Sequence, residues 1–314
     1  MNRRPGGQTP VKLRGKTAHQ PRVLRALCAA VSSAVCVGAL GACVGTDDTP
    51  TPTTSAVWTN DLGVPVAPML VGPEPGHTKN MKLASGRSFL LHVPENYTPE
   101  RSWPVLLSFH GWNDSPENME GYTQFDAAEA IVAYPQGVEK AWTPAPYAAT
   151  SEEEDVDFVR QIVDSLRATY SVDDDAIFAA GLSNGGGFAA FLACRMPGTF
   201  RSVATVSAAY YEGIHSECSE RPVGRLDIHG TDDPVVNYEG GVRHGTAYSS
   251  VAEVLGQHQK RNKCVGDVES LRLTNDAVKE TWTGCKAPLQ HIRINGGSHV
   301  WPCLLYTSDA ADER

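Results

Sequence analysis

The fold-determining stretch is Asp175-Ala-Ile-Phe-Ala-Ala-Gly-Leu-Ser183-Asn-Gly-Gly-Gly-Phe-Ala-Ala-Phe-Leu-Ala-Cys194, a Gly-x-Ser-x-Gly motif between two apolar runs. The run before the motif has the length of a short buried strand, and the Ala-rich run after it is typical of a helix. A serine on so sharp a strand-to-helix turn projects from the sheet, and glycines flank it because side chains would collide there. The context predicts that Ser183 is a nucleophile, although the bare motif could also be an ordinary Gly/Ser loop.

A serine hydroxyl is a useful nucleophile only when a base accepts its proton. His299 is the candidate base, because it lies in the Gly-rich loop 295–302 directly after the strand expected at 289–294. His291 falls inside that strand and is interpreted as structural.

The base needs a carboxylate to fix its tautomer and orientation. Asp232 and Asp233 both follow the strand expected at 225–229, at a sharp turn. Asp233, directly before Pro234, is the preferred acid, and Asp232 is the alternative, otherwise a turn-forming residue.

An oxyanion would need two backbone donors. The first is expected from the N–H of Asn184, which directly follows the nucleophile. The second is expected from the N–H of Trp112 in the loop after an earlier strand, where Gly111 permits close approach. His110 in the same loop is interpreted as a structural hydrogen-bonding residue.

Apolar runs alternate with helical patterns along the chain. Strands are expected at 88–93, 105–109, 130–135, 175–180, 203–206, 225–229 and 289–294, and helices at 156–170, 187–194 and 249–259. This alternation predicts an α/β fold with a doubly wound, mostly parallel sheet and helices on both faces.

Both ends of the chain differ in character from the centre. Residues 1–43 carry a basic segment followed by a short apolar one, as in an export signal, and Leu40-Gly41-Ala42-Cys43 resembles a bacterial lipobox. We expect Cys43 to be lipidated, with ordinary signal-peptidase cleavage as the alternative. Residues 44–75, rich in Thr and Pro, are expected to be a linker, and 76–302 the catalytic domain.

Residues 303–314 back-translate to a string that resembles a sequencing-library adapter read in frame. We therefore expect this segment to be an artefact, and the natural C-terminal segment to be missing from the domain.

Four cysteines fall within the expected domain, namely Cys194, Cys218, Cys264 and Cys285. An even number in an exported chain suggests two disulfides, for which three pairings exist. An expected hairpin formed by 268–273 and 278–282 would bring Cys264 and Cys285 together, which leaves Cys194 to pair with Cys218.

Two classes of partner are not expected. The formal net charge of −9 argues against nucleic acid as a partner. Neither a Cys-x-x-Cys nor a His-x-x-x-His spacing occurs, so no metal is expected.

Four stretches carry a family resemblance, namely 108–111, 181–186, 229–236 and 296–302. With them, residues 80–302 resemble the feruloyl esterase, acetyl xylan esterase and polyhydroxybutyrate depolymerase-like group of alpha/beta-hydrolases (carbohydrate esterase family one type). The resemblance implies Asp233 as the acid, supports both cysteine pairs, and implies a cofactor-free serine esterase. The expected partner is a hydroxycinnamoylated or acetylated polysaccharide ester. Contact with a membrane is expected only through the lipid anchor. The enzyme is expected to be secreted or held at the bacterial cell envelope.

The chain also departs from this family. Many relatives have a cysteine where Trp112 stands, which puts depolymerase activity in doubt. The alternatives are a polyhydroxybutyrate depolymerase or general short-chain esterase, and a non-catalytic surface lipoprotein. An aromatic platform near the site could be formed by Trp112, Trp142, Tyr147, Tyr238 and Trp301.

Overall fold

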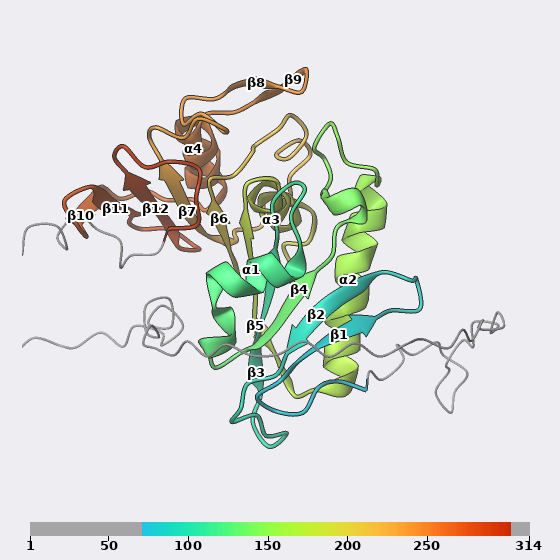
Figure 1. Cartoon of the computed structure of the whole chain (residues 1–314). Helices are drawn as coiled ribbons and strands as arrows, with labels where there is room; N and C mark the ends of the chain where they lie inside the picture. Colours follow the sequence, from blue (N-terminus) through green and yellow to red (C-terminus); the bar gives the residue numbers. More distant parts are fainter. Residues whose placement is uncertain (1–70, 303–314) are drawn as a thin grey trace, which may run out of the picture.

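The structure is a computed structural model that describes residues 71–302 (Figure 1). The expected export signal with Cys43, the linker as far as residue 70 and the segment 303–314 lie outside the described residues. Across residues 71–302 no helix combines the length and apolar character that a membrane span requires.

The helices are α1 (Pro116–Thr123), α2 (Glu152–Thr169), α3 (Asn184–Arg195) and α4 (Val251–Arg261), with short 3₁₀ turns at Phe125–Ala127 and Val138–Lys140. The strands are β1 (Thr78–Lys82), β2 (Ser88–His92), β3 (Trp103–Phe109), β4 (Ile131–Pro135), β5 (Val172–Leu182), β6 (Ser202–Val206), β7 (Gly224–Gly230), β8 (Gly241–Arg243), β9 (Thr246–Tyr248), β10 (Val268–Arg272), β11 (Ala277–Trp282) and β12 (Leu289–Ile294). Every strand and helix expected from the sequence is present, with its ends shifted by a few residues.

One ten-stranded sheet organises the molecule, in the order β1-β2-β4-β3-β5-β6-β7-β12-β11-β10. The six strands from β4 to β12 in this order are parallel, and antiparallel pairs flank them on both sides. After β3 the chain adds β4 on one side and β5 on the other, so the winding direction reverses between β3 and β5. In such sheets ligands bind beside this reversal, at the carboxyl ends of the strands.

Helices cover both faces of the sheet. Side chains alternate along β3, where Val105 and Leu107 belong to the large core that also contains residues of α2 and α3. Leu106 faces the smaller core that contains Met119 of α1. The predicted alpha/beta-hydrolase architecture, with a mostly parallel sheet and helices on both faces, is therefore confirmed.

Local sequence explains where the helices begin. Capping boxes start α2 at Ser151 and α4 at Ser250, each closed by a glutamate three residues later. Helix α1 was not among the expected elements, although Ser115 caps it and Pro116 occupies its first turn.

Two hairpins extend the fold. The hairpin β10–β11 was predicted and is confirmed, with register Val268 opposite Trp282. The hairpin β8–β9 was not predicted, because its strands have only three residues each. Its two loop residues, His244 and Gly245, both have positive φ (52° and 76°), as a type I′ turn requires.

Candidate active site

Ser183 stands at the carboxyl end of β5 and caps the N-terminus of α3. Its backbone is strained, with φ 55° and ψ −117°, and its N–H donates to the Val206 carbonyl at 2.9 Å. A Cβ on Gly185 would lie 2.2 Å from the Phe109 carbonyl oxygen, so no other residue fits there. The local sequence thus forms the tight strand-to-helix turn that the motif predicted.

Asp233 and His299 come together from two different loops. The Nδ1 atom of His299 lies 2.7 Å from Oδ2 of Asp233, whose side chain is fully buried. The other oxygen of Asp233 accepts the N–H groups of Val235 and Val236, each at 2.8 Å. Asp232 is exposed, so of the two candidate aspartates only Asp233 contacts the histidine.

A second histidine, His229, also faces Asp233. Its Nε2 lies 3.4 Å from Oδ2 of Asp233 and 2.9 Å from the Val236 carbonyl, to which it donates. Burial alone would lower the pKa of His229, but the hydrogen bond with Asp233 and the charge of Asp227 raise it above its ordinary value. Burial likewise works to raise the pKa of Asp233, and the hydrogen bonds from both histidines hold it below its ordinary value. The carboxylate therefore stays ionised at neutral pH.

His229 was not predicted to have a role. It lies four residues before Asp233 at the end of β7, and this spacing, together with its place in the stretch 229–236, is the sequence signal that could have identified it.

The loop after β3 brings Gly111 beside the serine, since a Cβ on Gly111 would lie 3.6 Å from Cβ of Ser183. The Nε2 atom of His110 accepts the Gly137 N–H at 3.1 Å, so its proton is on Nδ1, which donates to the Gly111 carbonyl at 2.7 Å. The Gly111 carbonyl and the Trp112 N–H belong to one trans peptide and therefore point in opposite directions. The hydrogen bond that holds the carbonyl toward His110 thus points the Trp112 N–H away from His110. Burial lowers the pKa of His110, which keeps the ring neutral.

The two expected oxyanion donors are both unengaged. Asn184 is the first residue of α3, where an N–H has no intrahelical acceptor. No backbone carbonyl between residues 71 and 302 accepts the N–H of Trp112. Ser183 and His299, by contrast, are not hydrogen-bonded to each other in this structure. The geometry joins acid to base and sets the serine beside the donors, and the catalytic roles remain a proposal.

His291 has a structural position, as interpreted from the sequence. It is fully buried in β12, with Nδ1 2.8 Å from Oδ2 of Asp227 and Nε2 2.8 Å from the Tyr238 hydroxyl. Both ring nitrogens are thus engaged away from Asp233.

The five aromatic residues considered for a platform do not gather in one place. Trp142 is fully buried between Phe109 and Phe188, and Trp301 packs against Tyr122 and Phe125 in the smaller core. Tyr238 is held by His291. Only Trp112 and Tyr147 pack together, with ring centroids 4.6 Å apart.

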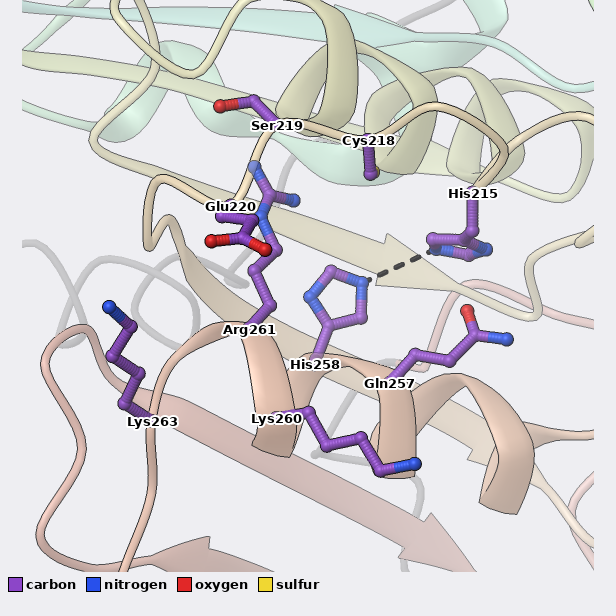
Figure 2. Close-up of a pocket in the computed structure, with 9 residues that line it drawn as sticks. All are labelled: His215, Cys218, Ser219, Glu220, Gln257, His258, Lys260, Arg261 and Lys263. Atoms are coloured by element: carbon purple, nitrogen blue, oxygen red, sulfur yellow. Dashed lines mark hydrogen bonds between the residues drawn. The ribbon is translucent and has the colours of Figure 1, made fainter.

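A cavity of about 410 Å³ lies elsewhere, between α4 and the loop after β6 (Figure 2). His258 of α4 points toward His215 of the loop, with their Nε2 atoms 3.3 Å apart. Arg225 donates to the same nitrogen of His258, and burial together with Arg225 lowers the pKa of His258 well below its ordinary value. None of the predicted catalytic or oxyanion residues lines this cavity.

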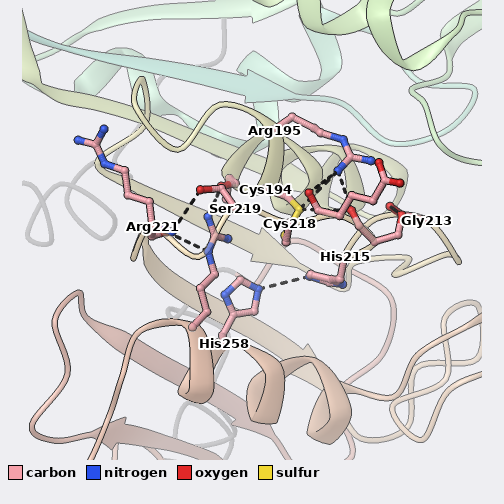
Figure 3. Close-up of a disulfide and its surroundings, with 12 residues drawn as sticks. Cys194, Arg195, Gly213, His215, Cys218, Ser219, Arg221 and His258 are labelled. Carbon is pink, nitrogen blue, oxygen red and sulfur yellow. Dashed lines mark hydrogen bonds between the residues drawn. A yellow bond between two sulfur atoms is a disulfide. The ribbon is translucent and has the colours of Figure 1, made fainter.

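Both predicted disulfides are present. Cys194, at the end of α3, is bonded to Cys218 in the loop after β6 (Figure 3). Cys264 is bonded to Cys285. Arg195 supports the first bridge, because its Nη1 donates to the Ser216 carbonyl at 2.6 Å.

Comparison with known proteins agrees with this geometry. Residues 81–288 match the model of a family described as "Putative esterase". Feruloyl esterase C of Emericella nidulans is 28% identical over 254 residues, covering 77% of this chain and 87% of its own length. A protein of Aspergillus niger named "Probable feruloyl esterase C" is 29% identical over 257 residues, covering 76% and 88%. Among solved structures, the acetyl xylan esterase from Aspergillus awamori superposes with a TM-score of 0.57 at 15% identity, covering 72% of this chain and 95% of that one.

Proposed function

Because the chain belongs to this esterase family, of carbohydrate esterase family one type, and is a carboxylic ester hydrolase, we propose that it is an exported feruloyl or acetyl xylan esterase. The reaction proceeds through an acyl-enzyme formed on Ser183. The observation that supports this mechanism is the 2.7 Å contact between His299 and a buried Asp233, on the sheet edge that also carries the strained Ser183.

In the first half-reaction Ser183 attacks the ester carbonyl and His299 takes the hydroxyl proton on Nε2. The Nδ1–H of His299 donates to Asp233, which fixes the tautomer and stabilises the imidazolium. His299 moves into hydrogen-bonding distance of Ser183 when substrate binds, since such bonds are often loose before substrate is present. It then protonates the leaving alcohol.

The tetrahedral oxyanion is bound by the N–H groups of Asn184 and Trp112. Both donors belong to rigid backbone, one at the start of α3 and one fixed through His110, so little reorganisation is needed. Water then attacks the acyl-enzyme with His299 as base, and the acid is released.

The nucleophile is tested by Ser183→Ala and by labelling with a fluorophosphonate. We expect this variant to lose ester hydrolysis and labelling while its thermal unfolding stays cooperative. Ser219→Ala, which changes an exposed serine far along the chain, is the matched control and should keep both. Turnover retained by Ser183→Ala would assign the nucleophile to another residue.

The acyl preference is tested with methyl ferulate, acetylated xylan and 3-hydroxybutyrate oligomers. The curated relatives named above are feruloyl esterases, so the first substrate is expected to give the highest kcat/KM. Preferred cleavage of the oligomers would replace the proposal with a polyester depolymerase.

Export is proposed from the basic and apolar segments of residues 1–43, together with the two disulfides, which persist in oxidising compartments. Lipidation of Cys43 predicts incorporation of labelled palmitate in a bacterial host, and Cys43→Ser should abolish it. Labelling that is unchanged in Cys43→Ser would contradict the lipid anchor.

A further inference from the structure

Three aromatic side chains meet beside the candidate nucleophile, namely Trp112, Tyr147 and His244, and we call them the aromatic cluster. The ring of His244 lies 5.0 Å from that of Trp112 and 4.9 Å from that of Tyr147, edge-on to both. Trp112 directly follows Gly111, the residue that adjoins Ser183. Despite these contacts, 46% of Trp112 is exposed.

The hairpin β8–β9 holds His244 in place at its tip (Figure 1). Its base is fixed by a bridge between Tyr211 and Tyr248, and Arg243, which directly precedes the turn, donates to the Val235 carbonyl at 3.0 Å. Val235 belongs to the loop that carries Asp233. The hairpin therefore spans from the acid loop to the oxyanion loop.

Two exposed valines belong to the segments that adjoin the cluster in the chain or through the backbone. Val242 on the hairpin is 73% exposed and Val138 is 36% exposed. Val138 begins the 3₁₀ turn that ends at Lys140, whose carbonyl accepts the N–H of Asn113 and so lies beside the Trp112 loop.

Strand order decides which part of an ester reaches the cluster. Trp112 follows β3, on one side of β5 and Ser183, whereas His299 follows β12, on the other side. In the tetrahedral intermediate the carbon carries the serine oxygen, the oxyanion, the alkoxy oxygen and the acyl carbon. The alkoxy oxygen must face His299 to receive its proton, and the oxyanion faces the N–H groups of Trp112 and Asn184. The acyl carbon therefore takes the remaining position, on the side away from His299.

We propose that the aromatic cluster binds the aryl ring of the substrate's acyl group and so selects hydroxycinnamoyl over acetyl esters. This inference rests on the proposed esterase function and assigns its acyl specificity to side chains. Aryl rings pack against one another in offset or edge-on contact at about 4.5–7 Å, which is the spacing already present within the cluster. His244 stands at the turn of the hairpin, where its ring nitrogens can bind a polar substituent of that aryl ring.

The test compares methyl ferulate with 4-nitrophenyl acetate in two variants. His244→Asn removes the ring and keeps the positive φ, which Asn tolerates in a type I′ turn. Tyr147→Ala removes the second ring. We expect each variant to raise KM for methyl ferulate about ten-fold and to leave kcat/KM for the acetate ester within about two-fold.

Two controls separate binding from folding. Tyr147→Phe keeps the ring and should behave as the unmodified enzyme, and His77→Asn changes an exposed histidine outside the cluster. An equal loss on both substrates, or no change on methyl ferulate, would overturn the inference.

A binding measurement keeps the inference apart from the proposed function. Free ferulic acid is titrated into the Ser183→Ala protein and followed by tryptophan fluorescence. His244→Asn and Tyr147→Ala in that background should each raise Kd about ten-fold. If the unmodified protein hydrolyses neither ester but the Kd shifts as expected, the proposed esterase function is wrong and the binding site is still supported. An unchanged Kd would disprove the site.

Discussion

Asn184 is joined to the backbone of Trp142 by two hydrogen bonds, both buried. Its Oδ1 accepts the Trp142 N–H at 2.8 Å and its Nδ2 donates to the Trp142 carbonyl at 2.9 Å. Asn184, which directly follows the candidate nucleophile, therefore also holds the segment before α2 in place. An amide side chain is the natural choice here, because it supplies a donor and an acceptor at once.

We predict that Asn184→Ala leaves this buried N–H and carbonyl unpaired and destabilises the protein by about 1–3 kcal/mol for each group. Asn184→Asp keeps the acceptor but sets a buried carboxylate oxygen against the Trp142 carbonyl, so it should lose at least as much. Urea unfolding of the two variants measures the difference. Equal stability of Asn184→Ala and the unmodified protein would show that the contact contributes nothing.

His110→Ala should lower kcat more than it changes KM. The Gly111 carbonyl loses the Nδ1–H that orients the Trp112 peptide, so the oxyanion donor is no longer fixed. Full loss of such a donor lowers kcat by roughly 10²–10³, and we expect a loss of at least ten-fold. Gln136→Ala, which removes a weaker 3.4 Å contact to the same ring and a 3.0 Å bond to the Gly137 carbonyl but leaves the bond from His110 to the Gly111 carbonyl, is the control. Steady-state kinetics that show a rise in KM alone would refute this role.

Asp233 should make the free energy of unfolding depend on pH in the acid range. Its pKa in the folded protein is held below the value of about 3.9 in the unfolded chain. Its contribution is therefore complete at pH values above 3.9 and is lost as the pH falls below it. The free energy of unfolding of Asp233→Asn should approach that of the unmodified protein as the pH drops from 6 toward 3. A constant gap across this range would contradict the depressed pKa.

Removal of one disulfide should be costly. Cys194 and Cys218 are 24 residues apart, so the double change to Ala frees a loop whose closure is worth roughly 2–4 kcal/mol. The bridge between Cys264 and Cys285, 21 residues apart, should give a similar value when removed in the same way. Urea midpoints under oxidising conditions measure both. Under reducing conditions the unmodified protein and the two double variants should unfold at about the same urea concentration. A difference that persists there would show that the lost stability comes from side-chain packing and not from the disulfides.

Two glycine substitutions should have opposite effects. Gly185→Ala places a methyl group 2.2 Å from the Phe109 carbonyl, so we expect poor folding or no activity. Gly256→Ala lies in α4 with open space around the new methyl, and should stabilise the protein by about 0.5–1 kcal/mol. Thermal unfolding compares the pair. Equal melting temperatures would show that the turn at Ser183 can widen.

Local patterns were sufficient for the long elements. Short runs of apolar residues located the central strands, and apolar residues at helical spacing or in an Ala-rich run located the helices α2, α3 and α4. The short elements could not be found in the same way. In β8 and β9 three residues are too few for a period, and α1 has weak amphipathicity, so only Ser115 and Pro116 mark it.

The sequence by itself determined the turn at Ser183, because the glycines on both sides permit a close approach of backbone that any side chain would block. It also determined one cysteine pair, since hairpin partners must meet at their ends. The sequence favoured Asp233 over Asp232, and the tertiary structure shows Asp233 buried against His299 while Asp232 is exposed. Only the tertiary structure decided the contact of His229 with Asp233 and the meeting of Trp112, Tyr147 and His244. The three aromatic residues come from loops far apart in the chain, and their distances depend on strand order, which no local pattern encodes.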